Sequence, residues 1–326
     1  MAARQKMDEE FMKAIQVFET GGPEKLTYGD KETPLPAKGQ ALVKLAASGV
    51  NYIDVYHRTG LYPQPSPFTP GMEGAGTVEA LGEGVTGLVI GQKVAYALCI
   101  GSYAEYAVVP AAQLVPVPTG LSLEQAAAVM LQGMTAHYLA HSTWKLVAGQ
   151  TCVVHACGGG VGLLLTQIAK MCGATVIGTT SAVPGSPKYE RAIKAGVDVI
   201  SNYEDFAARG VHVVYDSVGA TTFEASLNSL RPRGLMVTYG NSSGPVPDIS
   251  PLTLSQKGSI FLTRPSLGNY VATREELLWR SGDLFRWLAE GSLSLHIEKT
   301  YPLADAAQAH RDLESRQTSG KLLLSN

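Results

Sequence analysis

A glycine cluster between two β-rich runs is the part of this chain whose residue types point most directly to chemistry. Residues 153–162 read Val-Val-His-Ala-Cys-Gly-Gly-Gly-Val-Gly, and a helical pattern follows over residues 163–171. Glycines at such a turn let the backbone approach a phosphate, and the free N–H groups at the start of the helix bind it. A second β-rich run at 174–178 completes a strand–helix–strand unit. The spacing predicts a nucleotide site formed by Gly159, Gly160, Val161 and Gly162.

The residues after the second β-rich run indicate which dinucleotide this site prefers. A site for NADH usually has Asp or Glu about 20 residues after the glycines, bonded to the ribose 2′-hydroxyl. Here Thr179, Thr180 and Ser181 stand at that place, and Lys188 is the nearest cation. A carboxylate would repel a 2′-phosphate, whereas hydroxyls and a cation would accept one. The pattern favours NADPH, with Ser181 and Lys188 at the 2′-phosphate, although a solvated helix position is the default role of a lysine.

Cysteines and histidines offer little other chemistry. The four cysteines form no CxxC pair, which indicates a reduced cytosol and argues against disulfides or a structural zinc. Cys157 belongs to the glycine loop, and a small packing residue is a better interpretation of it than a redox group. His57 and His155 have no obvious Ser, Cys or Asp partner, so we expect neither to be catalytic.

Length and composition exclude several classes of protein. The 326 residues suffice for two domains, and a hydrophobic fraction of 45% with 17% charged residues suits a well-packed enzyme rather than a disordered chain. A net charge of −2 and a pI of about 6.4 give no basic field for nucleic acid. No apolar run reaches the roughly 18 residues of a membrane span. Residues 1–11 are charged and lack a signal core, so we expect a disordered extension there.

The remaining pattern divides the chain into three parts. Residues 13–118 read as β structure, with apolar runs at 41–45, 94–97 and 104–109 between Gly, Pro and Asp turns. Ser122 then caps a helix, and Gln125 completes a capping box. Residues 130–263 alternate strand and helix, which predicts an α/β, doubly wound parallel sheet. Its strands are expected at 151–154, 175–178, 197–200, 211–215, 235–239 and 259–262.

Two segments of this pattern are less regular. Residues 203–210 leave room for a helix of only about two turns, which is short against the usual 11–12 residues. The tail holds two helical patterns, at 275–290 and 304–315, and a terminal strand at 320–324. Neither helix extends the alternation, so we expect the tail to return to the β domain.

The region 51–63 carries a recognisable signature. Asn51, Asp54, Arg58, Gly60, Tyr62 and Pro63 match N-x-x-D-x-x-x-R-x-G-x-Y-P. On this motif and on those at 70–76, 158–162, 215–219, 239–244 and 313–322, the chain resembles the zeta-crystallin-like quinone oxidoreductases of the medium-chain dehydrogenase/reductase superfamily. The resemblance runs from Met12 to the C-terminus. It implies a discontinuous GroES-like β-barrel domain (12–130 and 272–326), a Rossmann domain (131–271), NADPH and a homodimer, with a tetramer as the alternative. The cytoplasmic location is expected from the cysteines.

The resemblance also implies roles for single residues. Asn51, Tyr56 and Tyr62 would lie in a polar loop beside the nicotinamide, with the tyrosine hydroxyls available to an acceptor oxygen. Asp54 would orient backbone. The implied cofactor contacts are Gln132 and Thr135 at the nicotinamide ribose, Asn241, and Tyr203 and Arg316, which join Ser181 and Lys188 at the 2′-phosphate.

Zinc is not expected. Zinc alcohol dehydrogenases of this superfamily carry Gly-His-Glu where this chain has Gly71-Met72-Glu73, and a thioether is a poor zinc ligand beside imidazole. The catalytic cysteine is also missing from residues 48–51. Without a metal to polarise an alcohol, reduction of a quinone or another conjugated carbonyl is favoured.

Two other functions stay open. Enzymes that reduce 2-enoyl thioesters share the loop signature. If this chain has that activity, Tyr62 would be its proton donor. Relatives of zeta-crystallin also have non-catalytic roles, as lens proteins or in RNA binding. The acidic pI and the lack of a Lys/Arg cluster argue against RNA. We therefore expect an NADPH:quinone oxidoreductase whose partner is a small quinone or enone, without nucleic acid or membrane.

Overall fold

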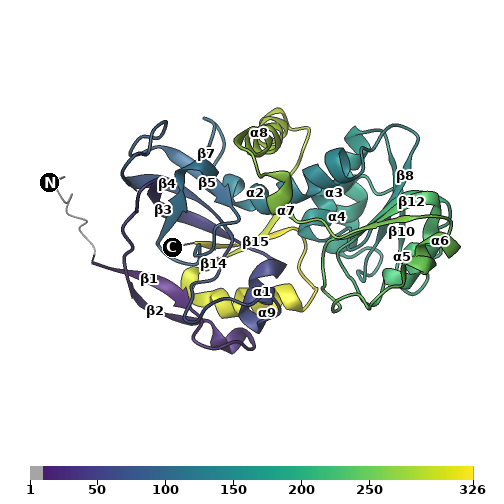
Figure 1. The fold of residues 1–326 in the computed structure, drawn as a ribbon, viewed down its shortest axis with the longest axis horizontal. Helices are drawn as coiled ribbons and strands as arrows, with labels where there is room; N and C mark the ends of the chain where they lie inside the picture. The colour runs from purple at the N-terminus through teal and green to yellow at the C-terminus, as the bar shows by residue number, and fades with distance from the viewer. Residues whose placement is uncertain (1–9, 326) are drawn as a thin grey trace. The chain divides into compact units, whose positions relative to one another are not determined.

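The computed structural model describes residues 10–325, which form two compact units (Figure 1). The first unit comprises residues up to 131 together with 297–316 and 321 onwards, and the second comprises 132–296 and 317–320. Most of the expected extension, residues 1–9, lies outside the described residues. Phe11 was assigned to that extension, but it begins strand β1 (Phe11–Gln16), and the carbonyl of Glu10 accepts the N–H of Thr33 at 3.1 Å.

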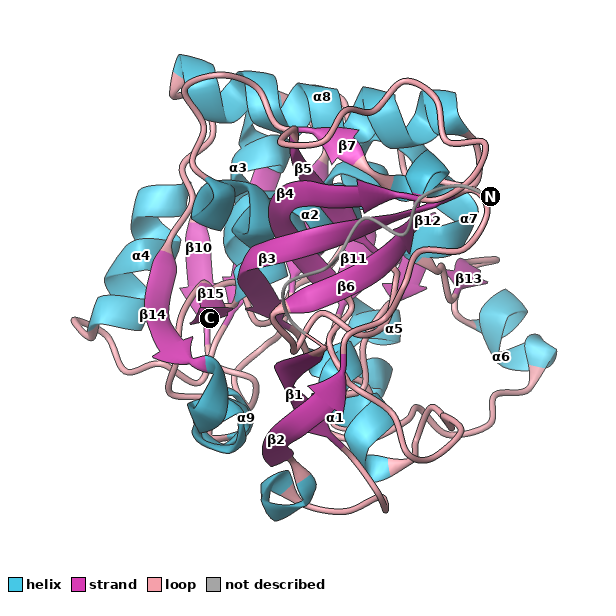
Figure 2. Cartoon of the chain, turned by 90° about the vertical axis from the view of Figure 1, so that its left-hand side faces the viewer, coloured by secondary structure: helices cyan, strands magenta, loops and turns pink. Residues whose placement is uncertain are grey.

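Antiparallel sheet dominates the first unit (Figure 2). The strand order is β14-β15-β3-β4-β5-β7, with β6 paired to β3, while β1 and β2 form a separate two-stranded sheet. Alternate side chains of β3, β4 and β5 fill the interior, where Val43, Val78 and Val94 are fully buried. The bounds are β2 (Thr27–Glu32), β3 (Gln40–Val50), β4 (Glu73–Leu81), β5 (Lys93–Ala97), β6 (Tyr106–Pro110), β7 (Val115–Pro116), β14 (Ile297–Pro302) and β15 (Lys321–Ser325).

A helix interrupts this unit where we predicted only strands and loops. Helix α1 (Tyr52–Thr59) follows β3 directly. The carboxylate of Asp54 accepts the backbone N–H of Asn51 at 2.9 Å, which is the orienting role expected of Asp54, and Gly60 ends the helix at φ +84°. The all-β prediction was wrong because eight residues are too few to show a helical apolar stripe. The cap spacing Asn-x-x-Asp carried the signal instead.

The other helical segments of the first unit are short. They are η1 (Pro23–Lys25), η2 (Ala111–Gln113), η4 (Leu303–Asp305) and α9 (Ala306–Glu314). Helix α9 lies beside α1 in Figure 1, and the hydroxyl of Tyr52 donates to the carbonyl of Leu313 at 3.2 Å. Helix α9 is therefore hydrogen-bonded to the first residue of α1.

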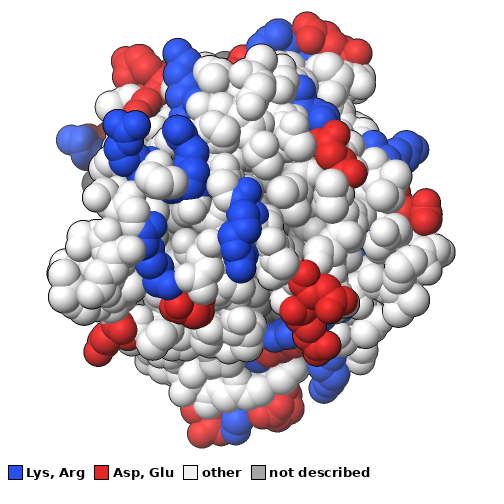
Figure 3. Space-filling view, turned by 90° about the vertical axis from the view of Figure 1, so that its right-hand side faces the viewer, with Lys and Arg blue, Asp and Glu red and all other residues white. Residues whose placement is uncertain are grey.

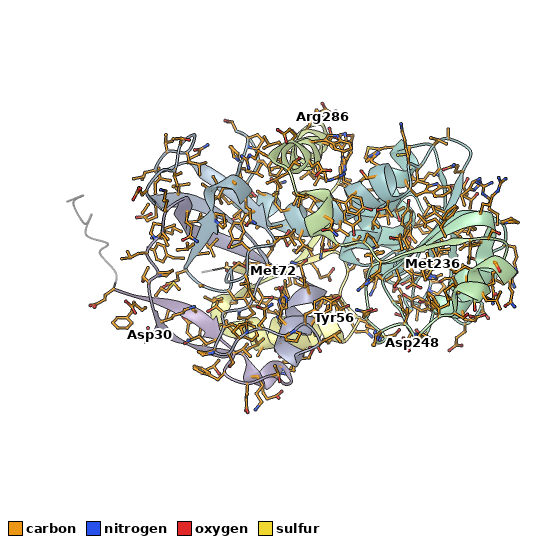
Figure 4. All side chains as sticks on the ribbon, in the orientation of Figure 1. Asp30, Tyr56, Met72, Met236, Asp248 and Arg286 are labelled. Atoms are coloured by element: carbon orange, nitrogen blue, oxygen red, sulfur yellow. The ribbon has the colours of Figure 1, made fainter. Side chains whose placement is uncertain are left out.

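A parallel sheet forms the second unit, as the sequence predicted. Its strand order is β10-β9-β8-β11-β12-β13, the doubly wound order that reverses next to β8. Val153, Val214 and Met236 are fully buried in its core, and Figure 4 labels Met236 within the sheet. The strands are β8 (Thr151–Val154), β9 (Thr175–Thr179), β10 (Val199–Ser201), β11 (Val211–Asp216), β12 (Leu230–Thr238) and β13 (Phe261–Thr263).

Several helices belong to the same unit as this sheet, and those over residues 160–171 and 223–229 pack against its strands. The helices are α3 (Gly160–Met171), α4 (Pro187–Ala195), α5 (Phe223–Ser229), α6 (Pro251–Gln256), α7 (Leu267–Tyr270) and α8 (Arg274–Glu290). Helix α2 (Leu123–Tyr138) and the π-helical turn η3 (Leu139–Thr143) precede β8. The backbone N–H of Ser122 donates to Oε1 of Gln125, and the backbone N–H of Gln125 donates to Oγ of Ser122, at 3.1 Å each. The capping box predicted before α2 is therefore confirmed. Within residues 10–325, no helix has both the length and the apolar character to cross a membrane.

The short helix expected before β11 is absent from the described residues 202–210. The side chain of Asn202 accepts the N–H of Asp205 at 2.6 Å, so a local turn replaces the first helical turn. Phe206 then enters the core edge-on to the ring of His155, with centroids 5.2 Å apart. The prediction was wrong because Phe206 is buried as a single core residue, and the segment forms no apolar helical face.

The tail returns to the first unit later than expected. Residues 272–296, which we placed in the β domain, belong to the second unit. The reason is polar packing of α8, the helix that carries the labelled Arg286 in Figure 4. His137 of α2 contacts Asp283 at 3.0 Å through Nε2 and Arg280 at 3.1 Å through Nδ1. Desolvation lowers the pKa of His137 to about 4, so the ring is neutral at pH 7.

Candidate functional site

The glycine loop connects β8 to α3 and is tightly packed. The N–H of Gly159 donates to the carbonyl of Ala156 at 2.8 Å, and the carbonyl of Gly159 accepts the N–H of Leu163 at 2.9 Å. A Cβ atom on Gly162 would collide with the backbone of Ala156 and stand 2.8 Å from Cα of Cys157. The N–H groups of Gly160 and Val161 belong to the first turn of α3 and have no partner four residues earlier within the helix. They are suited to an anion.

Gln132 lies against this loop. A Cβ atom on Gly160 would collide with the side-chain carboxamide of Gln132, whose Nε2 it would approach to 2.5 Å. The Gln132 side chain is 9% exposed, and among the described residues its Oε1 has no hydrogen-bond partner. Thr135, one turn further along α2, is also buried. An unpartnered buried acceptor beside a glycine cradle fits a bound molecule with donor groups.

Of the predicted 2′-phosphate residues in the second unit, Ser181 and Tyr203 follow the carboxyl ends of β9 and β10, and Lys188 lies in the first turn of α4. A Cβ atom on Gly158 would stand 2.8 Å from Cγ of Lys188, so the lysine stem packs along the glycine loop. Tyr203 contacts the side chain of Thr179 and the backbone of Ala156, and burial raises the pKa of its hydroxyl to about 12. Ser181 is exposed at the end of β9. The structure thus brings Lys188 from α4 and Tyr203 from the segment after β10 to the glycine loop.

Asn241 follows β12 at the same edge of the sheet. In the orientation that satisfies its neighbours, its carboxamide donates to the carbonyl of Gly240 and accepts from Nη2 of Arg264, each at 3.0 Å. Sequence reasoning missed Arg264. The available signal was an arginine directly after β13, because ligands of doubly wound sheets bind at the carboxyl ends of the strands.

Arg316 lies in the first unit, whereas the other predicted 2′-phosphate residues lie in the second. Its backbone is left-handed, at φ +63°, and its guanidinium interacts with the hydroxyl of Tyr52. Burial raises the pKa of Tyr52, and the charge of Arg316 opposes that rise. A phosphate role for Arg316 stays a prediction.

Two tyrosines of the predicted acceptor side form a pair. The rings of Tyr56 and Tyr62 meet edge to face, with centroids 5.2 Å apart. The N–H of Tyr62 donates to the carbonyl of Tyr56 at 3.0 Å, which folds the loop after α1 back onto the helix. Tyr56 therefore projects from a helix rather than from the predicted loop, and Figure 4 labels it there. Both side chains are half-buried.

Asn51 is held by a buried ion pair that sequence reasoning missed. Nζ of Lys321 contacts Oε2 of Glu73, and both side chains are fully buried. Lys321 also donates to Oδ1 of Asn51 at 2.8 Å, and Nδ2 of Asn51 donates to Oε2 of Glu73 at 2.8 Å. The available signal was a lysine at the head of the otherwise apolar strand β15, because a charge in a buried strand requires a partner.

A second buried hydrogen-bond network begins at Asp54. Complete burial raises the pKa of its carboxyl to about 7. The hydroxyl of Tyr103 donates to Asp54 and contacts Nε2 of His310, at 3.0 Å each. Burial, together with the charge of Arg58, lowers the pKa of His310 to about 3, so the ring is neutral. Arg58 in turn makes two 2.9 Å bonds to Glu314. This network of hydrogen bonds and an ion pair joins α1 to α9.

The position of the superfamily's zinc offers a poor cation site in this chain. Met72 precedes Glu73, and a Cβ atom on Gly71 would stand 2.8 Å from Cε1 of Tyr103, so the turn tolerates little change. The carboxylate of Glu73 already contacts Lys321, Asn51 and the N–H of Leu131. A cation there would have to displace an ammonium group. In the described part of the chain, no three His, Cys, Asp or Glu side chains group as metal ligands.

The second unit also contains a His–Ser–Asp cluster, although His155 was expected to lack such partners. Nε2 of His155 contacts Oγ of Ser226 at 2.8 Å, and Ser226 donates to Asp216 at 3.1 Å. All three are fully buried, and the serine lies between the other two, whereas in a catalytic triad the histidine does. The cluster is structural. Burial likewise raises the pKa of the Cys157 thiol to about 12, which leaves it unreactive at pH 7.

Comparison with known proteins covers nearly the whole chain. An alcohol dehydrogenase GroES-like domain model matches residues 37–119, and a zinc-binding dehydrogenase model matches residues 195–324. A quinone oxidoreductase of Pseudomonas aeruginosa is 43% identical over 322 residues, which is 96% of this chain and 99% of that protein. A 2-haloacrylate reductase of a Burkholderia species is 38% identical, with 95% of this chain and 98% of that protein covered.

Solved structures show the same likeness. An Escherichia coli quinone oxidoreductase complexed with NADPH has a TM-score of 0.92 and 40% identity, with 96% of this chain and all of that chain covered. The mixed fold, a GroES-like unit and a Rossmann-like unit, agrees with the fold class predicted from the sequence.

Proposed function

The chain belongs to the quinone oxidoreductase family of the medium-chain dehydrogenase/reductase superfamily, and from this premise we propose that it is an NADPH-dependent reductase of quinones or related conjugated carbonyls. The observation that carries the proposal is the second unit's cradle. Gly160 leaves room for the carboxamide of Gln132, and the stem of Lys188 packs along the glycine loop.

NADPH, when bound, would supply the reducing equivalents that pass to the acceptor. The first turn of α3 would hold the pyrophosphate, and Gln132 and Thr135 the nicotinamide ribose. Lys188, Ser181 and Tyr203 would hold the 2′-phosphate, and the same role is proposed for Arg316. The missing carboxylate after β9 supports this preference, because an acidic residue at this place would repel the phosphate.

Tyr56 and Tyr62 would donate hydrogen bonds from their hydroxyl groups to the acceptor. As the oxygen of a quinone gains charge, a hydroxyl donor stabilises it, and a donor fixed in advance stabilises it most. The edge-to-face pairing and the backbone bond between these tyrosines fix their rings relative to each other. Asn51 shapes the same region and has both amide hydrogens committed, to Glu73 at 2.8 Å and to the carbonyl of Gly49 at 3.2 Å. It therefore orders its surroundings rather than donating to the acceptor.

The reaction needs no zinc in this proposal. The support is the chemistry of the residues: Met72 replaces an imidazole ligand, and Lys321 already neutralises Glu73. A quinone is electrophilic without a Lewis acid.

The direct test is oxidation of NADPH, followed by its absorbance at 340 nm, with a panel of quinones, enones and enoyl thioesters. We expect turnover of quinones with NADPH and much weaker turnover with NADH. If no acceptor in the panel is reduced although NADPH binds, the proposed activity is wrong while the cofactor assignment stands.

A second candidate is reduction of an activated carbon–carbon double bond, as in a 2-enoyl thioester. The half-buried hydroxyl of Tyr62 could protonate carbon, and one relative is named a 2-haloacrylate reductase. A non-catalytic RNA role has less support. Figure 3 shows acidic as well as basic side chains on the exposed end of the second unit, rather than one continuous basic surface.

Assembly and location are further parts of the proposal. A homodimer, or a tetramer, would cover the outer edge of the parallel sheet, where Phe261 of β13 is exposed. Sedimentation equilibrium would measure the oligomeric state. A cytoplasmic location agrees with four cysteines that are all unpaired.

A further inference from the structure

We propose that Glu73 and Lys321 are positioning residues: they hold the carboxamide of Asn51 in a single orientation, so that Asn51 keeps the region beside the acceptor in the shape that the reaction needs. The inference rests on the proposed reductase function for its kinetic consequence. Its structural content concerns only the first unit. There a buried ion pair and a buried amide join β4, β15 and the start of α1.

The orientation of Asn51 follows from the charges around it. Oδ1 faces the ammonium of Lys321 at 2.8 Å, which can only donate. Nδ2 faces the carboxylate of Glu73 at 2.8 Å and the carbonyl of Gly49 at 3.2 Å, which can only accept. Rotating the amide by 180° would place its NH₂ against the ammonium and its oxygen against the carboxylate. Charged hydrogen bonds make that alternative unfavourable.

Space around the amide is restricted as well. A Cβ atom on Gly49 would collide with Oε2 of Glu73 and stand 2.7 Å from Nζ of Lys321. Gly49 therefore lets the ion pair approach the backbone of β3, just before Asn51. The remaining oxygen of Glu73, Oε1, accepts the N–H of Leu131 in α2 at 2.6 Å.

That last bond extends the network toward the proposed cofactor contacts. Leu131 is the residue before Gln132, and Thr135 follows on the same helix. One carboxylate thus holds Asn51 through Oε2 and the backbone of α2 through Oε1.

The ion pair can be removed without leaving a lone buried charge. The double variant Lys321→Met, Glu73→Gln is neutral: the carboxamide oxygen of the glutamine can still accept the N–H of Leu131, which leaves α2 held, while its NH₂ group can no longer accept from Nδ2 of Asn51. Removal of one partner of a buried ion pair is strongly destabilising because it leaves an uncompensated buried charge. We therefore expect the double variant to fold and to melt at a higher temperature than Lys321→Met alone, which leaves Glu73 unpaired.

Kinetics then separate positioning from a merely structural role. We expect the double variant to lose about 10²-fold in kcat with a quinone, the usual cost of a misplaced group, while the Kd of NADPH stays unchanged. Asn51→Ala should show a similar loss. Combining it with the double variant should add nothing further, because both changes act through the same amide. Full kcat in a folded double variant, or losses that multiply, would overturn the proposal.

A readout independent of activity keeps the two proposals distinguishable. In ¹⁵N NMR spectra, the side-chain amide hydrogens of Asn51 should exchange slowly with solvent in the parent and faster in the double variant. Equal exchange rates would contradict the positioning role even if every acceptor were inert. The matched control is Lys13→Met, Asp30→Asn, which removes an exposed 2.7 Å ion pair of the same unit and should change neither readout.

Discussion

Gly160 and Gln132 occupy adjoining space so closely that a Cβ atom on the glycine would overlap the carboxamide of the glutamine. Gly160 begins α3, and Gln132 belongs to α2, so the contact joins the residues that we propose for the pyrophosphate to those that we propose for the nicotinamide ribose. Because Oε1 of Gln132 is buried and has no hydrogen-bond partner among the described residues, its position matters for a ligand rather than for the fold.

Gly160→Ala should therefore weaken NADPH and NADH alike, because the added methyl group displaces the carboxamide that both cofactors would contact. We expect a Kd about 10-fold higher or more, measured by quenching of protein fluorescence. Gly282→Ala is the matched control: the site lies in α8, and a Cβ atom there would meet nothing within 4 Å. This variant should bind normally and unfold at a slightly higher temperature, because alanine is the better helix former. Unchanged affinity in Gly160→Ala would remove Gln132 from the site.

Lys188→Ala should discriminate between the two cofactors. A charged hydrogen bond contributes roughly 1.5–3 kcal/mol, so loss of the ammonium should weaken NADPH by about one to two decades. NADH lacks the 2′-phosphate and should bind as before. Lys194→Ala, an exposed lysine of the same helix α4, is the control. An equal loss for both cofactors would show that Lys188 acts on the loop and not on the phosphate.

Tyr62→Phe should separate quinone reduction from alkene reduction. Quinones accept electrons readily, and a neighbouring hydroxyl on Tyr56 remains, so we expect only a modest loss of quinone kcat. An enoyl thioester needs a proton at carbon, and removal of its donor should cost about 10²–10⁴-fold. Tyr28→Phe, at an exposed position of β2, controls for the loss of a hydroxyl alone. A parent that reduces enoyl thioesters faster than quinones, with that large loss, would favour the second candidate.

Chelation should leave activity intact. Glu73 is committed to Lys321, Asn51 and Leu131, and Met72 supplies no imidazole, so we expect no stoichiometric zinc by mass spectrometry and no loss of kcat in EDTA. A buffer control containing EDTA pre-loaded with zinc distinguishes metal removal from direct inhibition. Loss of turnover that returns on addition of zinc would contradict the expectation.

Asp54 should make stability fall as the pH rises from about 4 to about 7. Burial raises the pKa of this carboxyl to about 7 in the folded chain, while the unfolded value is near 3.9. In that window the folded state therefore binds the extra proton, and each pH unit costs up to about 1.4 kcal/mol of unfolding free energy. Asp54→Asn retains an acceptor for the N–H of Asn51 and cannot ionise.

The measurement is the difference in melting temperature between Asp54→Asn and the parent at several pH values. We expect the melting temperature of the variant to rise relative to that of the parent between about pH 4 and pH 7, and the difference to stay constant above pH 7. A difference that does not depend on pH would mean that Asp54 is already ionised at low pH in the folded protein. Because the comparison is with the parent, other titrating groups cancel.

The sequence alone determined those parts of the protein that depend on neighbouring residues. The glycine run, its flanking strands and the Ser122–Gln125 box are local patterns, and the six-stranded sheet and the capping bonds match them. The missing acid after β9 is also local, because a strand end and the turn that follows it are close in the chain. The spacing Asn51-x-x-Asp54, which marks the start of α1, is a local pattern of the same kind.

Tertiary structure decided whatever depends on residues distant in sequence. Lys321 and Asn51 are 270 positions apart, yet their side chains lie 2.8 Å from each other. No periodicity predicts such a pair, because the partner of a buried charge is chosen by strand pairing, here β15 against β3. The same holds for His155, whose contact with Ser226 spans 71 positions, and for α8, whose unit was set by Asp283 and Arg280 against His137. A buried polar group must find a partner, and only the folded chain determines which one is within reach.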